Sequence, residues 1–276
     1  MVEDYRRDEL APGDVLGDYL LEERLGEGGM GLVFRAKRGS DGATVAVKVM
    51  KLGVAEDETS RRRFVHEARA AADVRHESLV PIHEVGELDG RQFIVVAYVP
   101  GPTLDERIKE NGPLALPEAV RVARAIGAAL DALHERGIVH RDVKAANVLL
   151  HGEAPLLTDF GLAKGSSYTV LTQPGQVLGT LEYMAPELIR GAPATPASDI
   201  YGLGCVVYQC LAGKTPFGDR SLFEVGIAHL DEEPAPPGDA PALAEAVLTA
   251  LRKDPAERPP SGTEYAASIE RASDLA

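Results

Sequence analysis

The sequence is poor in cysteine, with only Cys205 and Cys210 among its 276 residues. Residues five apart on a helix do not face each other as residues three or four apart do, so a bridge between these two is not expected. We predict two buried, reduced thiols, and a disulfide or metal pair is the less favoured interpretation. Because disulfides are typical of oxidising compartments, this cysteine usage favours a cytoplasmic setting.

Long apolar runs are also missing. The longest, around residues 203–211, is too short and too interrupted to span a bilayer. The N-terminus is rich in charged residues and no apolar segment follows it, so we do not expect a signal peptide. We therefore expect no membrane contact by this segment, while the alternative that it is the cytosolic domain of a longer, membrane-anchored protein stays open.

An excess of positive charge is absent as well. The chain has 29 Lys and Arg residues against 43 Asp and Glu residues, a formal charge of −14. Nucleic acids and anionic membranes select basic surfaces, so neither is expected as the main partner. The length and the shares of 45% hydrophobic and 26% charged residues indicate a globular protein of one domain or two small ones. Any phosphate site in so acidic a chain has to be local and needs cations.

One polar loop, His140–Asn147, carries several chemically useful side chains between apolar flanks. Asp142 can accept a proton, Lys144 can hold an anion, and Asn147 can coordinate a metal through its amide oxygen. Phosphoryl transfer needs these three abilities together, because positioning and charge neutralisation supply most of its catalysis. The alternative is a solvated surface turn, although loops so loaded are more often functional.

The order His-Arg-Asp-x-Lys-x-x-Asn in this loop resembles the catalytic loop of the protein kinases. The preceding residues 136–139 (Arg-Gly-Ile-Val) resemble the bacterial, eukaryotic-like (Hanks-type) Ser/Thr kinases. The resemblance implies that Asp142 orients and deprotonates the substrate hydroxyl. It implies that Lys144 neutralises the phosphate in transfer.

The resemblance covers about residues 19–272 and implies an α+β, two-lobed protein-kinase fold. A small β-rich N-lobe carries one key helix, and a larger C-lobe is mainly helical. We expect a polar N-terminal lead over residues 1–14 and a kinase domain over residues 15–273. Its N-lobe is expected over about residues 15–99 and its C-lobe over about residues 100–273.

A glycine-rich turn lies between two strand-like segments near the N-terminus. Glycines let the backbone approach a phosphate closely, although a plain hairpin explains the turn alone equally well. Residues 32–37 after the turn alternate like a strand, which favours a kinase loop over a dinucleotide fold, where a helix would follow. The resemblance then implies that Gly26, Gly28 and Gly31 cover the phosphates of ATP.

A strand-like segment further on carries Lys48 in a Val-Ala-x-Lys pattern. The resemblance implies that Lys48 orients the α- and β-phosphates and is held by Glu67, in a helix that we predict over residues 57–74. For Glu67 alone, a solvated helix charge is an equal alternative. Two more strands are predicted over residues 76–85 and 92–99.

By the same resemblance, apolar side chains sandwich the adenine ring. Val96 limits access to the back of this pocket, and the backbones of Ala97 and Val99 hydrogen-bond to adenine. The apolar residues of the predicted pocket are Leu25, Val33, Ala46, Val96 and Leu149.

The triplet Asp159-Phe160-Gly161 lies twelve residues after Asn147 and precedes Ala185-Pro186-Glu187. In that order it matches the metal-binding motif of the kinases. A carboxylate and an amide oxygen suit a hard cation. We therefore predict that Asp159 and Asn147 hold Mg²⁺ (or Mn²⁺) beside ATP.

The segment after Gly161 is rich in Ser, Thr, Gly and Gln, which is compatible with a plain mobile loop. The resemblance makes it an activation segment, with Thr172 as the first candidate phosphosite. Its phosphate would add charge that Arg141 and Arg63 can meet, and autophosphorylation between molecules would require a transient homodimer. The other candidates are Thr169, Ser166 and Ser167.

Four further residues match structural positions of the family. The resemblance implies that Thr180 lies near the catalytic residues and that Asp199 braces the backbone of the catalytic loop. It also implies that Glu187 forms a buried ion pair with Arg258. These pairings have no role in small-molecule kinases, so they favour the protein-kinase branch. Lys144 and Thr180 argue for Ser/Thr rather than Tyr acceptors.

The sequence therefore predicts an ATP-dependent protein kinase that phosphorylates Ser/Thr hydroxyls of protein substrates and itself. Two alternatives remain at this point. One is a nucleotide-binding pseudokinase that acts as a scaffold, which the intact Lys48, Asp142, Asn147 and Asp159 disfavour. The other is a small-molecule phosphotransferase, which would place phosphate on a metabolite instead of a protein.

Overall fold

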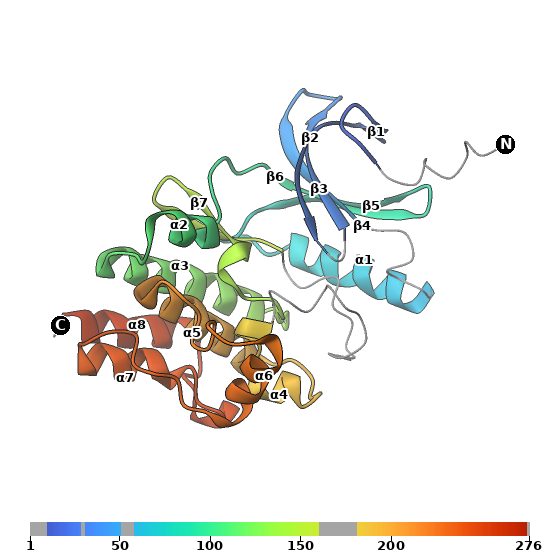
Figure 1. Cartoon of the computed structure of the whole chain (residues 1–276). Helices are drawn as coiled ribbons and strands as arrows, with labels where there is room; N and C mark the ends of the chain where they lie inside the picture. The colour runs from blue at the N-terminus through green and yellow to red at the C-terminus, as the bar shows by residue number, and fades with distance from the viewer. Residues whose placement is uncertain (1–9, 29–30, 51–57, 160–180, 275–276) are drawn as a thin grey trace. The chain divides into compact units, whose positions relative to one another are not determined.

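The structure is a computed structural model that describes residues 10–28, 31–50, 58–159 and 181–274. By its internal contacts the chain divides into two compact units (Figure 1). Unit 1 comprises residues 1–73 and 80–99, and unit 2 comprises residues 74–79 and 100–276. The predicted α+β architecture is confirmed, because unit 1 is a sheet with one helix and unit 2 is mainly helical.

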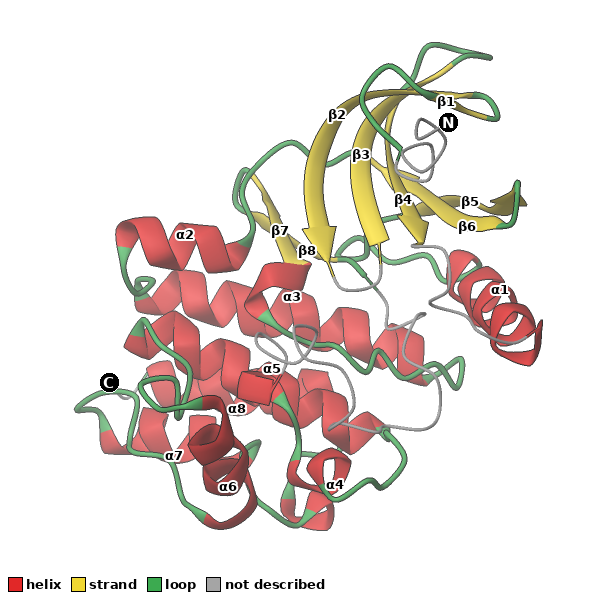
Figure 2. Ribbon diagram, turned by 45° about the vertical axis from the view of Figure 1, so that its right-hand side comes forward, coloured by secondary structure: helices red, strands yellow, loops and turns green. Residues whose placement is uncertain are grey.

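Unit 1 is built on a six-stranded antiparallel sheet with the order β1-β2-β3-β4-β6-β5 (Figure 2). Strands that follow each other in the chain are neighbours in the sheet, except β4 and β5. In the sequence, the helix α1 comes between these two strands. The elements are β1 (Val15–Leu16), β2 (Tyr19–Gly28), β3 (Gly31–Arg38), β4 (Thr44–Met50), α1 (Glu58–Ala72), β5 (Ile82–Leu88) and β6 (Arg91–Ala97).

One face of this sheet forms the hydrophobic core of unit 1. Phe34, Val47 and Val95 lie side by side on β3, β4 and β6, and all three are fully buried. Leu32 and Ala36 on β3, Val45 and Val49 on β4 and Phe93 on β6, each two residues away from one of them, belong to the same cluster. Because successive side chains in a strand point to opposite faces, the intervening residues must lie on the other face of the sheet.

The predicted strand over residues 76–85 is wrong at its start, because β5 begins only at Ile82. Leu79 instead forms a bridge with Leu157. The carbonyl oxygen of Ser78 accepts a hydrogen bond from the Leu157 N–H at 2.8 Å. Pro81 has no N–H to donate to a ladder, which favours a strand that begins after it.

Unit 2 contains seven α-helices and a short hairpin in its described part. These are α2 (Leu104–Asn111), α3 (Leu116–His134), β7 (Val148–His151), β8 (Ala154–Leu157), α4 (Pro186–Ile189), α5 (Pro196–Ala212), α6 (Leu222–Asp231), α7 (Pro241–Thr249) and α8 (Gly262–Ser273). Three single turns of 3₁₀ helix accompany them: η1 (Ala145–Asn147), η2 (Leu181–Tyr183) and η3 (Pro255–Glu257).

The helix α5 is the centre of unit 2. Every residue from Ser198 to Cys210 is buried, and the helix contacts α3, α7 and η2. An apolar run with no polar face is what a fully enclosed helix requires. Cys205 and Cys210 lie on this helix as free, fully buried thiols, which confirms the prediction for both residues.

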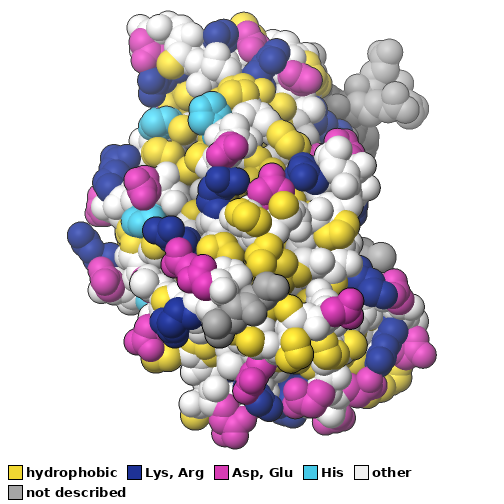
Figure 3. All heavy atoms as spheres, turned by 90° about the vertical axis from the view of Figure 1, so that its left-hand side faces the viewer, with side chains coloured by type: hydrophobic (Ala, Val, Ile, Leu, Met, Phe, Trp, Pro, Cys, Tyr) yellow, Lys and Arg dark blue, Asp and Glu magenta, His cyan; other side chains and the backbone are white. Residues whose placement is uncertain are grey.

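None of the helices in the described part of the chain is both long and apolar enough to cross a membrane. On the face shown in Figure 3, Lys and Arg side chains are interspersed with Asp and Glu side chains over the visible surface. No basic patch gathers on that face. An interspersed surface of this kind lacks the single-sign field that attracts phosphate backbones.

The helices α3 and α8 approach each other at a pair of glycines. A methyl group on Gly127 would lie 2.5 Å from the carbonyl oxygen of Gly262, and one on Gly262 would lie 2.4 Å from the carbonyl oxygen of Gly127. Asp131 of α3 also accepts hydrogen bonds from the N–H groups of Gly262 at 2.7 Å and Thr263 at 2.8 Å. The start of α8 is thus capped by a side chain of α3, which satisfies donors that a helix leaves open at its first turn.

This crossing predicts the effect of Gly127→Ala. Alanine is the better helix former by about 1 kcal/mol, but here the added methyl group meets backbone atoms that cannot rotate away. We expect the free energy of unfolding to fall by about 1–3 kcal/mol, as for other overpacked sites. Chemical denaturation measures this loss. Gly238→Ala, where nothing lies within 4 Å of the new methyl group, is the control. Equal stability of the two variants would contradict the prediction.

Candidate active site

Several of the predicted nucleotide-binding residues of unit 1 lie on the sheet face opposite its hydrophobic core. Val33 pairs with Lys48 across β3 and β4, and Ala46, two residues before Lys48, pairs with Val96 across β4 and β6. Gly26 of β2 pairs with Val33. Partners directly opposite in a ladder share a face, as do residues two apart. The strand register therefore collects predicted residues from four strands on one surface.

The two described ends of the glycine-rich turn have different surroundings. A methyl group on Gly31 would lie 2.1 Å from the carbonyl oxygen of Val49, so β3 and β4 leave room only for glycine there. Nothing lies within 4 Å of the corresponding position on Gly26. The close approach of β3 and β4 thus requires glycine at position 31, whereas no contact among the described residues requires it at position 26.

The segment predicted to hold adenine has one backbone donor already engaged. The N–H of Ala97 donates to the carbonyl oxygen of Pro81 at 2.9 Å. Ala97 therefore has only its carbonyl oxygen to offer a ligand. Leu25 has an exposed fraction of 43%, which is high for a large apolar side chain. Lys48 on β4 and Glu67 on α1 are both half-buried in unit 1, and their ion pair stays a prediction.

The three polar residues of the catalytic loop meet in unit 2. The Oδ2 atom of Asp142 lies 2.9 Å from Lys144 Nζ and 3.1 Å from Asn147 Nδ2. Asn147 Nδ2 also donates to the backbone carbonyl oxygen of Asp142 at 2.8 Å. Asp142 and Lys144 are mostly buried, with side-chain exposures of 14% and 21%. A carboxylate in contact with an ammonium group and an amide is well suited to orient a hydroxyl group beside transferred phosphate.

Asn147 and Asp159 flank the β7–β8 hairpin. The N–H of Thr158 donates to the carbonyl oxygen of Asn147 at 2.9 Å, which places Asp159 one residue from this contact. The amide nitrogen of Asn147 donates hydrogen bonds to Asp142, which leaves the amide oxygen, Oδ1, as the atom that can bind a cation. An amide oxygen and a carboxylate are hard donors that fit Mg²⁺ or Mn²⁺.

The protein supplies only part of a metal shell here. Among the described residues, no group of three or more His, Cys, Asp or Glu side chains is placed to hold a metal ion. Mg²⁺ keeps several waters and is often bound by one or two protein oxygens together with substrate phosphates. The pair Asn147 and Asp159 is therefore compatible with a cation that arrives with a nucleotide.

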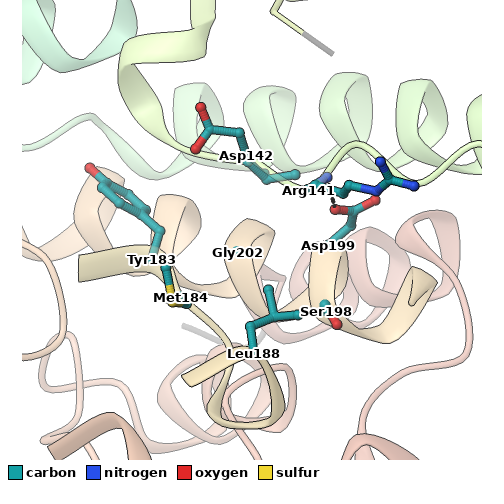
Figure 4. A pocket seen from close by; sticks show the side chains of 9 residues that line it. Arg141, Asp142, Tyr183, Met184, Leu188, Ser198, Asp199 and Gly202 are labelled. Carbon is teal, nitrogen blue, oxygen red and sulfur yellow. Dashed lines mark hydrogen bonds between the residues drawn. The ribbon is translucent and has the colours of Figure 1, made fainter. Parts of the chain in front are cut away.

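Asp199 holds the backbone of the catalytic loop. Its Oδ2 atom accepts the His140 N–H at 2.7 Å. Its Oδ1 atom accepts the Arg141 N–H at 2.8 Å (Figure 4). The His134 Nε2 atom lies 2.8 Å from Oδ2. Arg141 has a φ of 67°, a conformation that costs free energy in a residue with a side chain and persists only where surrounding contacts impose it. Asp199 provides those contacts.

His140 packs beneath the same loop. Its side chain is fully buried, and burial lowers the pKa of the imidazole, so the ring is neutral. Its Nδ1 atom accepts the Asp142 N–H at 3.3 Å. The other ring nitrogen, Nε2, therefore carries the proton and donates to the carbonyl oxygen of Thr158 at 3.1 Å. The imidazole links the catalytic loop to the strand that leads to Asp159.

The guanidinium group of Arg258 uses all five of its N–H donors. It donates to the two carboxylate oxygens of Glu187 at 2.7 and 2.8 Å and to the carbonyl oxygens of Ala197, Arg252 and Lys253. Burial alone would raise the pKa of Glu187, but its hydrogen bonds and charge interaction with Arg258 lower it below its ordinary value. The predicted pairing of Glu187 with Arg258 is present, and it joins α4 to the segment that precedes α8.

Comparison with known proteins agrees with this arrangement. Residues 19–264 match the family described as the protein kinase domain. The chain belongs to the protein kinase family. Members of this family use ATP and a divalent metal, and the predicted site residues lie on the two units of this kinase domain.

Bacterial relatives and solved structures are similar to this kinase domain over most of its length. It is 38% identical to the probable serine/threonine-protein kinase PknB of Corynebacterium glutamicum, covering 92% of this chain and 42% of the relative. It is 38% identical to the serine/threonine-protein kinase PknE of Mycobacterium tuberculosis, covering 89% and 44%. A crystal structure of a mutant of the M. tuberculosis PknI kinase domain has a TM-score of 0.78 at 31% identity and covers 96% of this chain and 99% of that chain. The chain thus spans less than half the length of these curated relatives.

Some predicted residues lie outside the described part of the kinase domain. These are Thr172, Thr169, Ser166, Ser167 and Thr180, together with Phe160 and Gly161. The side chain of Arg63 is likewise outside it. Their roles stay predictions.

Sequence reasoning missed several residues that support the site. Ser198 donates to Glu187 Oε1 at 2.8 Å, and His134 contacts Asp199. Tyr183 donates to Gln209 Oε1 at 2.5 Å. The two partners of each contact are between 11 and 65 positions apart along the chain, so no local sequence pattern predicts these contacts.

Proposed function

We propose that this kinase domain transfers the γ-phosphate of ATP to Ser and Thr hydroxyl groups of protein substrates and of its own chain. The observation that carries the proposal is the contact of Asp142 with Lys144 and Asn147 in a loop braced by Asp199. The relatives named as serine/threonine-protein kinases support the choice of acceptor. Lys144 adds to that support, since tyrosine kinases typically lack a lysine at the matching position.

The residues of unit 2 perform the transfer in this proposal. Asp142 orients the acceptor hydroxyl and takes its proton. The ammonium group of Lys144 offsets the negative charge of the phosphoryl group during its transfer. Asn147 and Asp159 hold the divalent cation, which when bound offsets negative charge on the phosphates. Charge stabilisation of this kind supplies much of the barrier reduction in phosphoryl transfer.

The residues of unit 1 bind the nucleotide in this proposal. Lys48, steadied by Glu67, orients the α- and β-phosphates, and Gly26, Gly28 and Gly31 cover them. Apolar side chains with the backbones of Ala97 and Val99 hold adenine. The one-faced arrangement of Val33, Ala46, Lys48 and Val96 supports this assignment. The apolar residues that unit 1 contributes are Leu25, Val33, Ala46 and Val96.

Setting and partners follow from the same assignment. We place the domain in the cytoplasm, where ATP is available and where the free thiols of Cys205 and Cys210 stay reduced. The proposed partners are protein substrates and, for autophosphorylation, a second copy in a transient homodimer. Nucleic acid is not a proposed partner, because the formal charge is −14.

The test is incubation of the purified domain with γ-labelled ATP and Mg²⁺, alone and with a mixed protein acceptor, followed by phosphoamino acid analysis. We expect label on Ser and Thr, and its loss when EDTA removes the metal. Label only on small metabolites would favour a small-molecule phosphotransferase. ATP binding without label on any acceptor would favour the pseudokinase scaffold.

Thr172 is the proposed site of autophosphorylation. Its phosphate would add nearly two negative charges to a segment that follows the metal-binding motif. We expect Thr172→Ala to lose most of the label incorporated into the chain and to lower activity toward other proteins by about tenfold or more, as when a phosphate no longer orders a loop. Mass spectrometry of the labelled chain locates the phosphate. Thr263→Ala, the same substitution at an exposed position of α8, is the matched control, and unchanged activity and labelling in Thr172→Ala would assign the switch to another residue.

A further inference from the structure

His229 is a buried polar residue that the proposed chemistry does not use. It lies on the inner face of α6, and its side chain is completely buried. The ring packs edge to face against Phe217 and Tyr201, with centroids 4.9 and 5.6 Å away. A histidine placed this deeply needs partners for both ring nitrogens, because an unpaired buried polar atom costs free energy.

Both nitrogens have partners, and these define the tautomer. Nε2 lies 3.1 Å from the carbonyl oxygen of Glu182, which can only accept, so Nε2 carries the proton. Nδ1 lies 2.7 Å from the Tyr201 hydroxyl, which then donates to it. Burial together with the nearby charge of Lys253 lowers the pKa of His229 to about 3, which keeps the ring neutral.

The carbonyl group that His229 holds belongs to the turn η2. That turn is also held from α5, where Gln209 accepts the Tyr183 hydroxyl at 2.5 Å. Other residues of the helix α6 also contact η2. Two neighbouring residues of one turn are therefore fastened by different helices, Glu182 through its backbone and Tyr183 through its side chain.

The same turn forms a wall of the small cavity beside the catalytic loop. Tyr183 and Met184 line this cavity together with Arg141 and Asp142. Figure 4 shows Asp142 on one side of it and Tyr183 with Met184 on another. Asp142, the proposed proton acceptor, and Tyr183 of η2 thus line the same cavity, so a shift of the η2 backbone would change the surface beside Asp142.

We infer that His229 is a positioning residue for the protein substrate, acting through the Glu182 carbonyl group to hold η2 beside Asp142. The inference rests on the proposed protein kinase function. It assigns to α6 a role in acceptor binding that is separate from nucleotide binding, because Tyr201 and Glu182, the hydrogen-bond partners of His229, both lie in unit 2. Loss of the hydrogen bond to Glu182 should therefore weaken acceptor binding and leave ATP binding unchanged.

The experiment compares His229→Phe and His229→Gln with Tyr201→Phe. His229→Phe keeps a ring and removes the donor to Glu182, whereas His229→Gln retains an N–H donor on a side chain that can reach the same carbonyl group. Tyr201→Phe removes only the hydroxyl group on the other side of the imidazole and is the matched control. The acceptor is the peptide that the wild-type domain phosphorylates fastest in a degenerate Ser/Thr peptide array.

We expect His229→Phe to raise KM for the peptide roughly tenfold, the effect of about one hydrogen bond, with KM for ATP and kcat within about twofold of wild type. Tyr201→Phe should stay within about twofold on all three constants, and His229→Gln should recover most of the lost affinity. In the wild-type domain, the side-chain ¹H–¹⁵N spectrum of His229 should show the neutral Nε2–H tautomer.

Other outcomes overturn the inference. An unchanged peptide KM in His229→Phe, an equal rise in Tyr201→Phe, or an Nδ1–H tautomer would each show that His229 only fills space in the core. Equal losses for peptide and ATP would show general loss of structure. A wild-type domain that phosphorylates no peptide in the array would instead contradict the proposed function, which separates the two failures.

Discussion

Asp142→Asn is expected to lower the rate of phosphoryl transfer by about 10²–10⁴-fold, the usual contribution of a positioned proton acceptor. The amide of asparagine has the shape of the carboxylate but does not take the hydroxyl proton. It also removes the negative partner of Lys144, which lies 2.9 Å from Asp142 Oδ2. The measurement is the initial rate of label transfer to a protein acceptor at saturating ATP and Mg²⁺.

Binding of ATP should survive this change. The nucleotide residues proposed on unit 1 are untouched, so the Kd for ATP should stay within about threefold of wild type, a difference below 1 kcal/mol. The matched control is Asp219→Asn, the same substitution in an exposed ion pair with Lys214. If Asp142→Asn transferred phosphate as fast as Asp219→Asn, Asp142 would have no part in the chemistry.

Arg258→Ala is expected to lower the free energy of unfolding by about 3–5 kcal/mol, because it leaves the carboxylate of Glu187 buried without its partner. The Arg258 guanidinium has a side-chain exposure of 0% and donates to Glu187 and to three backbone carbonyl groups. Replacing this side chain removes the hydrogen bonds that Arg258 donates to all of these acceptors. Chemical denaturation followed by circular dichroism measures the loss, and thermal unfolding should show a fall in Tm of roughly 10 °C.

Three further variants sharpen this test. Arg258→Lys should also be destabilised, since an ammonium group does not reproduce the five donors of the planar fork. Lys214→Ala, which breaks the exposed pair with Asp219, should change stability by less than about 1 kcal/mol. Adding Glu187→Gln to Arg258→Ala should restore part of the loss, because the stranded charge is then gone. A loss in Arg258→Ala no greater than in Lys214→Ala would contradict the assignment.

The chemistry of the site was predictable because its parts are local in sequence. Asp142, Lys144 and Asn147 lie within six positions of one another, so a single short loop carries all three. The nucleotide face of unit 1 was predictable in part, because strand alternation puts Val33 on the face opposite Phe34. Prediction failed at the start of β5, where Ser78 and Leu79 contact Leu157 instead of extending the strand.

The sequence by itself determined the family, the residue types of the transfer site and the buried, reduced state of Cys205 and Cys210. Only the tertiary structure decided what holds those residues in place. Asp199 accepts hydrogen bonds from residues 58 to 65 positions away, and His229 contacts a carbonyl group 47 positions away. The physical reason is that the partners of a buried hydrogen bond are set by how the helices pack against one another. The spacing of the two residues along the chain does not predict that they will come into contact.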